Sequence, residues 1–245
     1  MLKGSMILMK KELSDYFSSP LIYIIAGVFS LIMGLLFYNF LVTNQELTNL
    51  SLANSILLPT FGAMNFLLMF IVPLLTMGHF AEESKNETLD LILRSDLSVV
   101  DIIIAKFLST FFVVLFLVML TLVFPIILSF SGYDQWAIVW TNYGAVLLSV
   151  CAYIAVGLFA SSITENQIVS VVVSFSVLFA FLLLINMSSV TENYIVGMIL
   201  QYFSIGFHHA HLSKGMVVSF NLVYYVSFVG FFSFLTYKSL DSRNW

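Results

Sequence analysis

The sequence has little charge for its length. Of its 245 residues only 9% are Asp, Glu, Lys or Arg, whereas 60% are hydrophobic and the mean hydropathy is +1.04. A water-soluble domain of this size needs a larger charged surface. The composition therefore predicts a membrane protein. The net charge of −4 also excludes the basic surface that is typical of nucleic-acid binding.

Residues that carry chemistry are scarce as well. Cys151 is the only cysteine, so an intrachain disulfide is excluded. The sequence contains no G-x-x-x-x-G-K-[ST] phosphate loop, no Ser-His-Asp set and no paired carboxylates of a hydrolase. We therefore predict no catalytic residue, no cofactor and no metal site in this chain. Three histidines, His208, His209 and His211, lack a nearby cysteine or carboxylate, and we interpret them as polar residues at the membrane surface rather than as metal ligands.

Long apolar runs are what the sequence does contain. A bilayer core of about 30 Å needs roughly 20 apolar residues per helix, and six runs have that length. They are Leu21 to Val42, Ile56 to Met77, Ile102 to Ser129, Asn142 to Ser161, Ile168 to Met187 and Val217 to Tyr237. The predicted fold is therefore an all-α integral membrane domain over residues 1–245, with six transmembrane helices.

Short polar motifs predict where several of these helices begin. Ser19-Pro20 gives a cap followed by proline in the first turn, and Ser98 with Asp101 resembles a capping box, as does Thr164 with Gln167. We also expect kinks at the three prolines inside apolar runs, which are Pro59, Pro73 and Pro125.

Apart from Lys106, close to one end of its run, the six runs hold no Asp, Glu, Lys or Arg. An ion-driven transporter places ionisable or ion-coordinating groups near the midplane. This absence argues against a proton relay, so another chain must supply the energy for any transport.

Positive residues favour the cytoplasmic side of a membrane. With six spans and a cytoplasmic N-terminus, Lys214 alone lies outside. The other eight positive residues are then cytoplasmic, namely Lys3, Lys10, Lys11, Lys85, Arg94, Lys106, Lys238 and Arg243. We therefore predict that both termini are cytoplasmic.

Residues 1–18 show helical amphipathicity, with Lys3, Lys10 and Ser14 off an apolar stripe. The stripe consists of Leu2, Met6, Met9, Leu13 and Phe17. We interpret this segment as a helix lying on the inner leaflet, with a flexible tail as the alternative. His79, beside the charged stretch, is interpreted as an interfacial anchor.

The apolar segment Tyr194 to Phe207 is too short to cross a bilayer. We predict a re-entrant or interfacial hairpin within residues 188–215 on the outer face, with a seventh span as the alternative. Small residues four apart, Gly157 with Ser161 and Ser170 with Ser174, indicate close helix packing, either within the chain or at a dimer seam.

Nine of the 22 charged residues lie between Phe80 and Lys106. Within residues 80–101 an apolar stripe alternates with polar positions, which predicts an amphipathic cytoplasmic helix that docks on a partner; a solvated loop is the alternative. The stripe is Leu89, Ile92, Leu93 and Leu97, and the positions off it are Glu87, Asp90 and Arg94.

These residues carry a family resemblance. The series Glu82-Glu83, Glu87-Thr88-Leu89-Asp90-Leu91-Ile92-Leu93, Leu97-Ser98 and Ala105-Lys106 resembles the E-E-x-x-x-G-T-L-E-x-L-L…P-x-S…G-K stretch of ABC-2 type transporter permeases. Lys10-Lys11-Glu12-Leu13 before Ser19-Pro20 is similar to the K-E-L…S-P opening of that family. Lys214-Gly215 followed by Leu240, Arg243 and Trp245 resembles the ending of the gliding-motility-type branch. The chain departs from the pattern at Glu87, Asp96 and Ala105, where the family commonly has glycine, proline and glycine.

The resemblance implies a permease in a bacterial inner membrane that pairs with a second permease copy, or a homologous one, and with ABC ATPase subunits that bind ATP and Mg²⁺. It implies that the ATPase docks on a coupling helix formed by Glu82, Glu83, Glu87, Thr88, Leu89, Asp90, Ile92, Leu93 and Arg94, helped by Lys10, Lys11, Glu12 and Leu13. An extracytoplasmic accessory subunit and contacts with membrane lipid are also expected. We expect export of an apolar, amphipathic or polymeric cargo; the alternative is a non-transporting component that transmits force or a signal to an extracytoplasmic partner.

Overall fold

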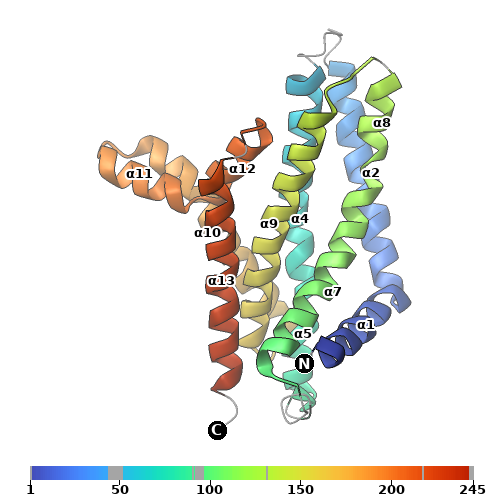
Figure 1. The fold of residues 1–245 in the computed structure, drawn as a ribbon, viewed down its shortest axis with the longest axis vertical. Coiled ribbons are helices and arrows are strands. Elements are labelled where there is room, and N and C mark those ends of the chain that lie inside the picture. The colour runs from blue at the N-terminus through green and yellow to red at the C-terminus, as the bar shows by residue number, and fades with distance from the viewer. Residues whose placement is uncertain are drawn as a thin grey trace.

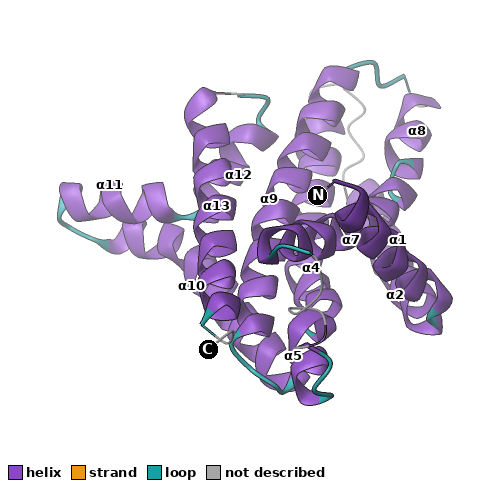
Figure 2. Ribbon diagram, turned by 60° about the horizontal axis from the view of Figure 1, so that its bottom comes forward, coloured by secondary structure: helices purple, strands orange, loops and turns teal. Residues whose placement is uncertain are grey.

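The computed structural model describes residues 2–43, 52–89, 91, 97–130, 132–216 and 218–242, and every regular element in these ranges is a helix (Figures 1 and 2). Within these described ranges, six helical segments are long and apolar enough to cross a membrane. They are Pro20–Thr43, Asn54–Lys85, Val99–Phe130, Trp136–Ser162, Gln167–Val190 and Ser219–Asp241. Each contains or closely overlaps one predicted run, so the all-α fold with six candidate spans is confirmed.

The spans pack around one central helix. α9 (Trp136–Ser162) is the most buried of them, and it contacts α4 (Leu58–Thr76), α7 (Val99–Leu120), α10 (Gln167–Val190) and α13 (Ser219–Asp241). α2 (Pro20–Thr43) packs on α4 at the edge of the bundle. The remaining elements are α1 (Leu2–Ser18), the π-helical η1 (Leu52–Leu57), α5 (Gly78–Lys85), α8 (Val123–Phe130), α11 (Tyr194–Phe203) and α12 (Ile205–Ser213).

Two of the predicted helix starts are confirmed and one is wrong. Ser98 accepts a hydrogen bond from the Asp101 N–H and donates one to the Asp101 carboxylate, and α2 begins at Pro20. α10, however, is capped by Asn166, whose side chain accepts from the Ile168 N–H. The chain is still extended at Asn166, so the helix begins too late for a Thr164 cap.

The predicted prolines behave differently from one another. Pro59 lies in the first turn of α4, where its missing N–H costs nothing, and α4 continues as a helix through Pro73. The helix does break at Thr121, four residues before Pro125, where the proline ring removes the expected hydrogen bond. Tighter turns fill the gap, since the Thr121 N–H bonds the Val118 carbonyl.

Gly157 and Ser161 pack within the chain, as the first of the two expected alternatives requires. A Cβ atom at Gly157 would overlap Thr76 of α4. The Ser161 hydroxyl accepts from the Phe80 and Ala81 N–H groups and donates to the Met77 carbonyl. The pair therefore fixes α9 against the junction of α4 and α5.

α11 doubles back along α10 and projects away from the bundle (Figures 1 and 2). None of its residues is buried. α12 then returns the chain to α9, at the end of the bundle opposite α1 (Figure 1). These two short helices occupy the predicted outer segment; that they form a re-entrant hairpin stays a prediction.

Candidate functional site

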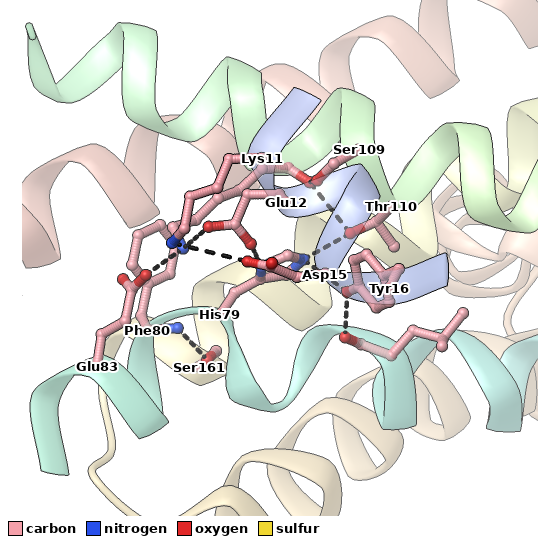
Figure 3. A network of polar contacts seen from close by, with 12 residues as sticks. Lys11, Glu12, Asp15, Tyr16, His79, Phe80, Glu83, Ser109, Thr110 and Ser161 are labelled. Carbon is pink, nitrogen blue, oxygen red and sulfur yellow. Dashed lines mark hydrogen bonds and ion pairs between the residues drawn. The ribbon is translucent and has the colours of Figure 1, made fainter. Parts of the chain in front are cut away.

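A buried group of charged side chains lies where α1, α5 and α7 meet (Figure 3). At its centre is Lys106, which is 1% exposed. Its Nζ atom lies 2.6 Å from Oε1 of Glu83 and 3.2 Å from Oε1 of Glu12, and it sits 5.3 Å from the centre of the Phe80 ring. Burying a lysine is costly unless it is paired. Two carboxylates from different helices supply that pairing here.

His79 extends the group toward α1 and α7. Its Nδ1 atom lies 3.5 Å from Oε2 of Glu12, and its Nε2 atom lies 2.6 Å from the Thr110 hydroxyl and 3.0 Å from the Tyr16 hydroxyl. Tyr16 donates to the Leu75 carbonyl and Thr110 donates to the Lys106 carbonyl. We call these residues, Glu12, Tyr16, His79, Glu83, Lys106 and Thr110, the lysine network.

The network keeps Glu12 ionised. Burial raises the pKa of this carboxyl group, but the hydrogen bond from His79 and the positive charge of Lys106 outweigh it and lower the pKa to about 2. Burial also raises the pKa of Tyr16, so its hydroxyl stays protonated and remains a donor. α1 is therefore held by one charged and one neutral contact.

An open groove of about 630 Å³ connects the network to the surface. Its walls include Lys11 and Asp15 of α1, Glu82 of α5 and Gln167 at the start of α10. The Gln167 side chain donates a hydrogen bond to the Glu82 carboxylate at 2.8 Å, and this bond connects α10 to α5. Polar groups on three helices thus converge at the end of the bundle that carries α1 and the C-terminal end of α13 (Figure 1).

Two groups of residues that the sequence suggested separately meet here. Glu12, from the predicted N-terminal helix, and Glu83, from the predicted coupling stretch, share Lys106. Leu13 packs against the hydrophobic core, whereas Lys10 and Lys11 are exposed, and Lys11 lines the groove beside Glu12. α1 thus packs on α7 while Lys10 and Lys11 stay exposed.

The structure describes only some residues of the predicted coupling helix. Glu82, Glu87 and Thr88 are exposed. Leu89, by contrast, is 3% exposed and belongs to the protein's own core, so in this conformation its side chain is not available to a partner. The remaining members, Asp90, Ile92, Leu93 and Arg94, lie outside the described residues.

Glu87 has a backbone φ of +57°, in the left-handed region that favours glycine. The chain reverses here, and the Thr88 N–H bonds the Glu83 carbonyl at 2.9 Å. The permease pattern commonly has glycine at this position. This chain therefore keeps the turn although it has Glu87 in place of the common glycine. The Glu87 backbone is strained as a result.

Some network residues were missed or misplaced by sequence reasoning. His79 is 5% exposed, so the interpretation as an interfacial anchor is wrong; its ring points into the protein. Lys106, Tyr16 and Thr110 were not identified as site residues. A signal for Lys106 and Thr110 exists, since they are four apart and share one face of the apolar run Ile102 to Ser129, which holds no other charged residue.

A profile of the ABC-2 type transporter family matches residues 5–189. The chain belongs to this family. A comparison with curated proteins gave no significant match. Every residue of the lysine network lies inside the matched range, whereas α11, α12 and α13 lie beyond it. The ABC-2 chain is thus a membrane-spanning permease component, a type of subunit that generally works with an ABC ATPase.

The ABC-2 chain has a second polar cluster at the other end of the bundle. His208 Nδ1 lies 2.8 Å from Oδ1 of Asn221, and His209 Nδ1 lies 3.2 Å from the hydroxyl of Ser149, which also shares a hydrogen bond with Tyr225. Among the described residues no three His, Cys, Asp or Glu side chains converge as metal ligands. We call His208, His209, Ser149, Asn221 and Tyr225 the outer histidine cluster, after the predicted orientation of the chain.

His208 and His209 are buried, so the interpretation as residues at the membrane surface is wrong for both; His211 is partly exposed. Burial lowers the pKa of His209 to about 4. This histidine is therefore neutral at physiological pH, and it holds α12 to Ser149 of α9 through an uncharged hydrogen bond.

Proposed function

We propose that the chain is the permease subunit of an ABC exporter in a bacterial inner membrane. In this proposal a separate ATPase subunit binds ATP with Mg²⁺ and hydrolyses it, and the permease moves substrate outward. The distribution of lysine and arginine supports cytoplasmic termini, which puts the lysine network on the side of the ATPase.

The lysine network is the observation that carries the proposal. It joins α1, α5 and α7, although Lys106 is 94 residues from Glu12 and 23 from Glu83. Separating a buried ion pair leaves an uncompensated charge and costs about 3–5 kcal/mol. We therefore expect α1, α5 and α7 to move together as one rigid body. A push on the segment that follows α5 would pass through this body to the spans.

Exposed residues beside the network provide the docking surface in this proposal. Glu87 and Thr88 are exposed, and the side chain of Leu91 is 70% exposed. Lys10 and Lys11 face outward on α1. These positions combine an apolar anchor with charges of both signs, which suits a specific contact with another protein.

A second permease copy would complete the transport path. α10 supports this step, because only 17% of its most apolar stretch is buried within the chain. Phe66, Phe70, Phe175 and Phe179 form an unbroken row of ring contacts across α4 and α10. Such a row on an exposed seam fits an apolar or amphipathic cargo.

The docking step is tested with Leu91→Glu. Because Leu91 is exposed, the variant should fold normally but lose association with the candidate ATPase encoded in the same gene neighbourhood. Co-purification and permease-stimulated ATP hydrolysis measure the loss. Val190→Glu is the matched control, since Val190 is 83% exposed at the far end of α10. Undiminished association and stimulation in Leu91→Glu would refute docking at this segment.

The transport step is tested in reconstituted vesicles that contain the permease and the ATPase. ATP-dependent movement of a labelled lipid or polymer supports export. Stimulated hydrolysis without movement of any cargo would favour the alternative, a component that transmits force or a signal to an extracytoplasmic partner. Membership of the gliding-motility-type branch rests on the C-terminal pattern and is part of the proposal; an accessory subunit co-purifying on the outer face would strengthen it.

A further inference from the structure

An apolar groove of about 530 Å³ lies between α7 and α13, at the end of the bundle that carries the lysine network. Ile104 and Phe107 form part of one wall, and Val229, Phe234 and Tyr237 form part of the other. Ser233 and Tyr237 are the two described lining residues that carry a polar side-chain atom. We propose that the groove binds an acyl chain of an anionic phospholipid from the adjoining leaflet.

The depth of the groove fits one leaflet. Along α13 it runs from Val229 to Tyr237, and at about 1.5 Å per residue these eight steps span roughly 12 Å. Half of a bilayer core is about 15 Å thick. The groove also ends near the inner ends of both helices, because Val100 lies in the first turn of α7 and Tyr237 in the last turns of α13.

The chemistry of the groove excludes water as a good occupant. A water molecule needs two to four polar partners, and apolar cavities of this kind stay dry. The volume lies within the range of about 300–1,000 Å³ that is typical of small-molecule sites. In a bilayer the apolar molecules available to fill such a groove are lipid chains.

A cation stands at the mouth. The Nζ atom of Lys238 lies 5.7 Å from the centre of the Tyr237 ring, which lines the groove. Its protein partner is Asp241 at 3.9 Å, in an exposed pair that contributes little. A lipid phosphate would offer Lys238 a stronger, charge-assisted contact while the acyl chain occupies the groove.

A second copy of the chain fits this groove less well. Nine residues line it, whereas a stable protein interface uses about 20–30 residues on each side.

The test uses nanodiscs that contain either photoactivatable phosphatidylglycerol or photoactivatable phosphatidylcholine, each with the reactive group in the acyl chain. We expect labelling to concentrate on the peptides that hold Phe107 and Phe234. Ser233→Trp should reduce this labelling at least fivefold, and the smaller Ser233→Leu should reduce it partly. Val226→Trp is the matched control, since Val226 is 70% exposed on α13 and does not line the groove.

The headgroup contact is tested with Lys238→Gln. In this variant the ratio of labelling by phosphatidylglycerol to labelling by phosphatidylcholine should fall by about fivefold. This factor corresponds to the roughly 1 kcal/mol that one lysine contributes near an anionic surface. Labelling spread evenly over the six spans, or unchanged by Ser233→Trp in a protein that still folds, would overturn the proposal. A disulfide-linked dimer of Phe234→Cys in a Cys151→Ser background would also overturn it, because the occupant would then be a second copy.

Discussion

The lysine network and the outer histidine cluster bury polar groups at opposite ends of the same bundle, by opposite means. In the network Lys106 faces two carboxylates, and Glu12 is held ionised with a pKa of about 2. In the outer cluster His209 has a pKa of about 4 and is neutral. One end thus relies on compensated charges, and the other relies on neutral hydrogen bonds.

This difference predicts different responses to change. Removing one member of a charged network leaves the others buried without compensation, so the cost is large. Removing one neutral hydrogen bond in a membrane protein costs on average only about 0.6 kcal/mol. The charged end lies inside the matched range of the ABC-2 family and the neutral outer helices lie beyond it. A mechanical role therefore suits the lysine network. A role in fixing the position of α12 suits the outer histidine cluster.

Lys106→Met should have the largest effect. Its side chain keeps a similar length, but Glu12 and Glu83 lose their shared partner, and the free energy of unfolding in detergent should fall by about 3–5 kcal/mol. Thermal unfolding measures the loss. Adding Glu12→Gln and Glu83→Gln to this variant should restore part of it, because the triple variant buries no uncompensated charge. If Lys106→Met were as stable as the wild type, the proposed difference in energetic cost between the lysine network and the outer histidine cluster would be wrong.

The outer cluster should respond to pH through His209. Its pKa is about 4 in the folded chain and 6.5 when unperturbed. Between these values the unfolded chain binds more protons, so stability is complete above about pH 6.5 and falls as the pH drops toward 4. The slope should not exceed about 1.4 kcal/mol per pH unit.

This slope is measured by unfolding the wild type and His209→Gln between pH 4 and pH 8. The difference between the two curves isolates His209 from the other titrating groups. A variant with the same pH dependence as the wild type would show that His209 is not buried in its neutral form.

Sequence reasoning was most accurate where one physical rule decides the outcome. Length and hydropathy located the six spans, because a helix that crosses a bilayer must satisfy its backbone and bury an apolar surface. Ser98 with Asp101 also gave a correct start, since a capping box is a local interaction. Local reasoning was wrong at Thr164, because Asn166 is a better cap and lies closer to the helix.

The lysine network could not be predicted from local patterns. Its members are joined by tertiary packing, and the shared contacts of Lys106 reach across 23 and 94 residues. Glu12 did give a usable sign, because it lies between Leu8, Leu13 and Tyr16 on the packed face of α1. A carboxylate among buried apolar positions requires a partner, and Lys106 is the one basic residue in the six apolar runs.

Ser149→Ala should have a moderate effect on the outer cluster. The Ser149 hydroxyl contacts both His209 and Tyr225, so the variant should lose about 1 kcal/mol. Ser109→Ala is the matched control at the inner end, because the Ser109 hydroxyl is also buried but donates only to the Lys106 carbonyl within its own helix. Thermal unfolding of both variants checks the order. A larger loss in Ser109→Ala would contradict the assignment of Ser149 as a tie between helices.

Lys11→Gln should have the smallest effect on stability, and it separates stability from docking at the inner end. Lys11 lies 3.7 Å from Asp15 in an exposed pair, and such pairs contribute at most about 0.5 kcal/mol on a helix. The melting temperature should therefore hardly change, in contrast to Lys106→Met. Association with the ATPase should nevertheless weaken severalfold if the outward face of α1 helps to seat that subunit. Unchanged association would confine docking to the segment after α5, while the lysine network would still be needed to transmit its movement.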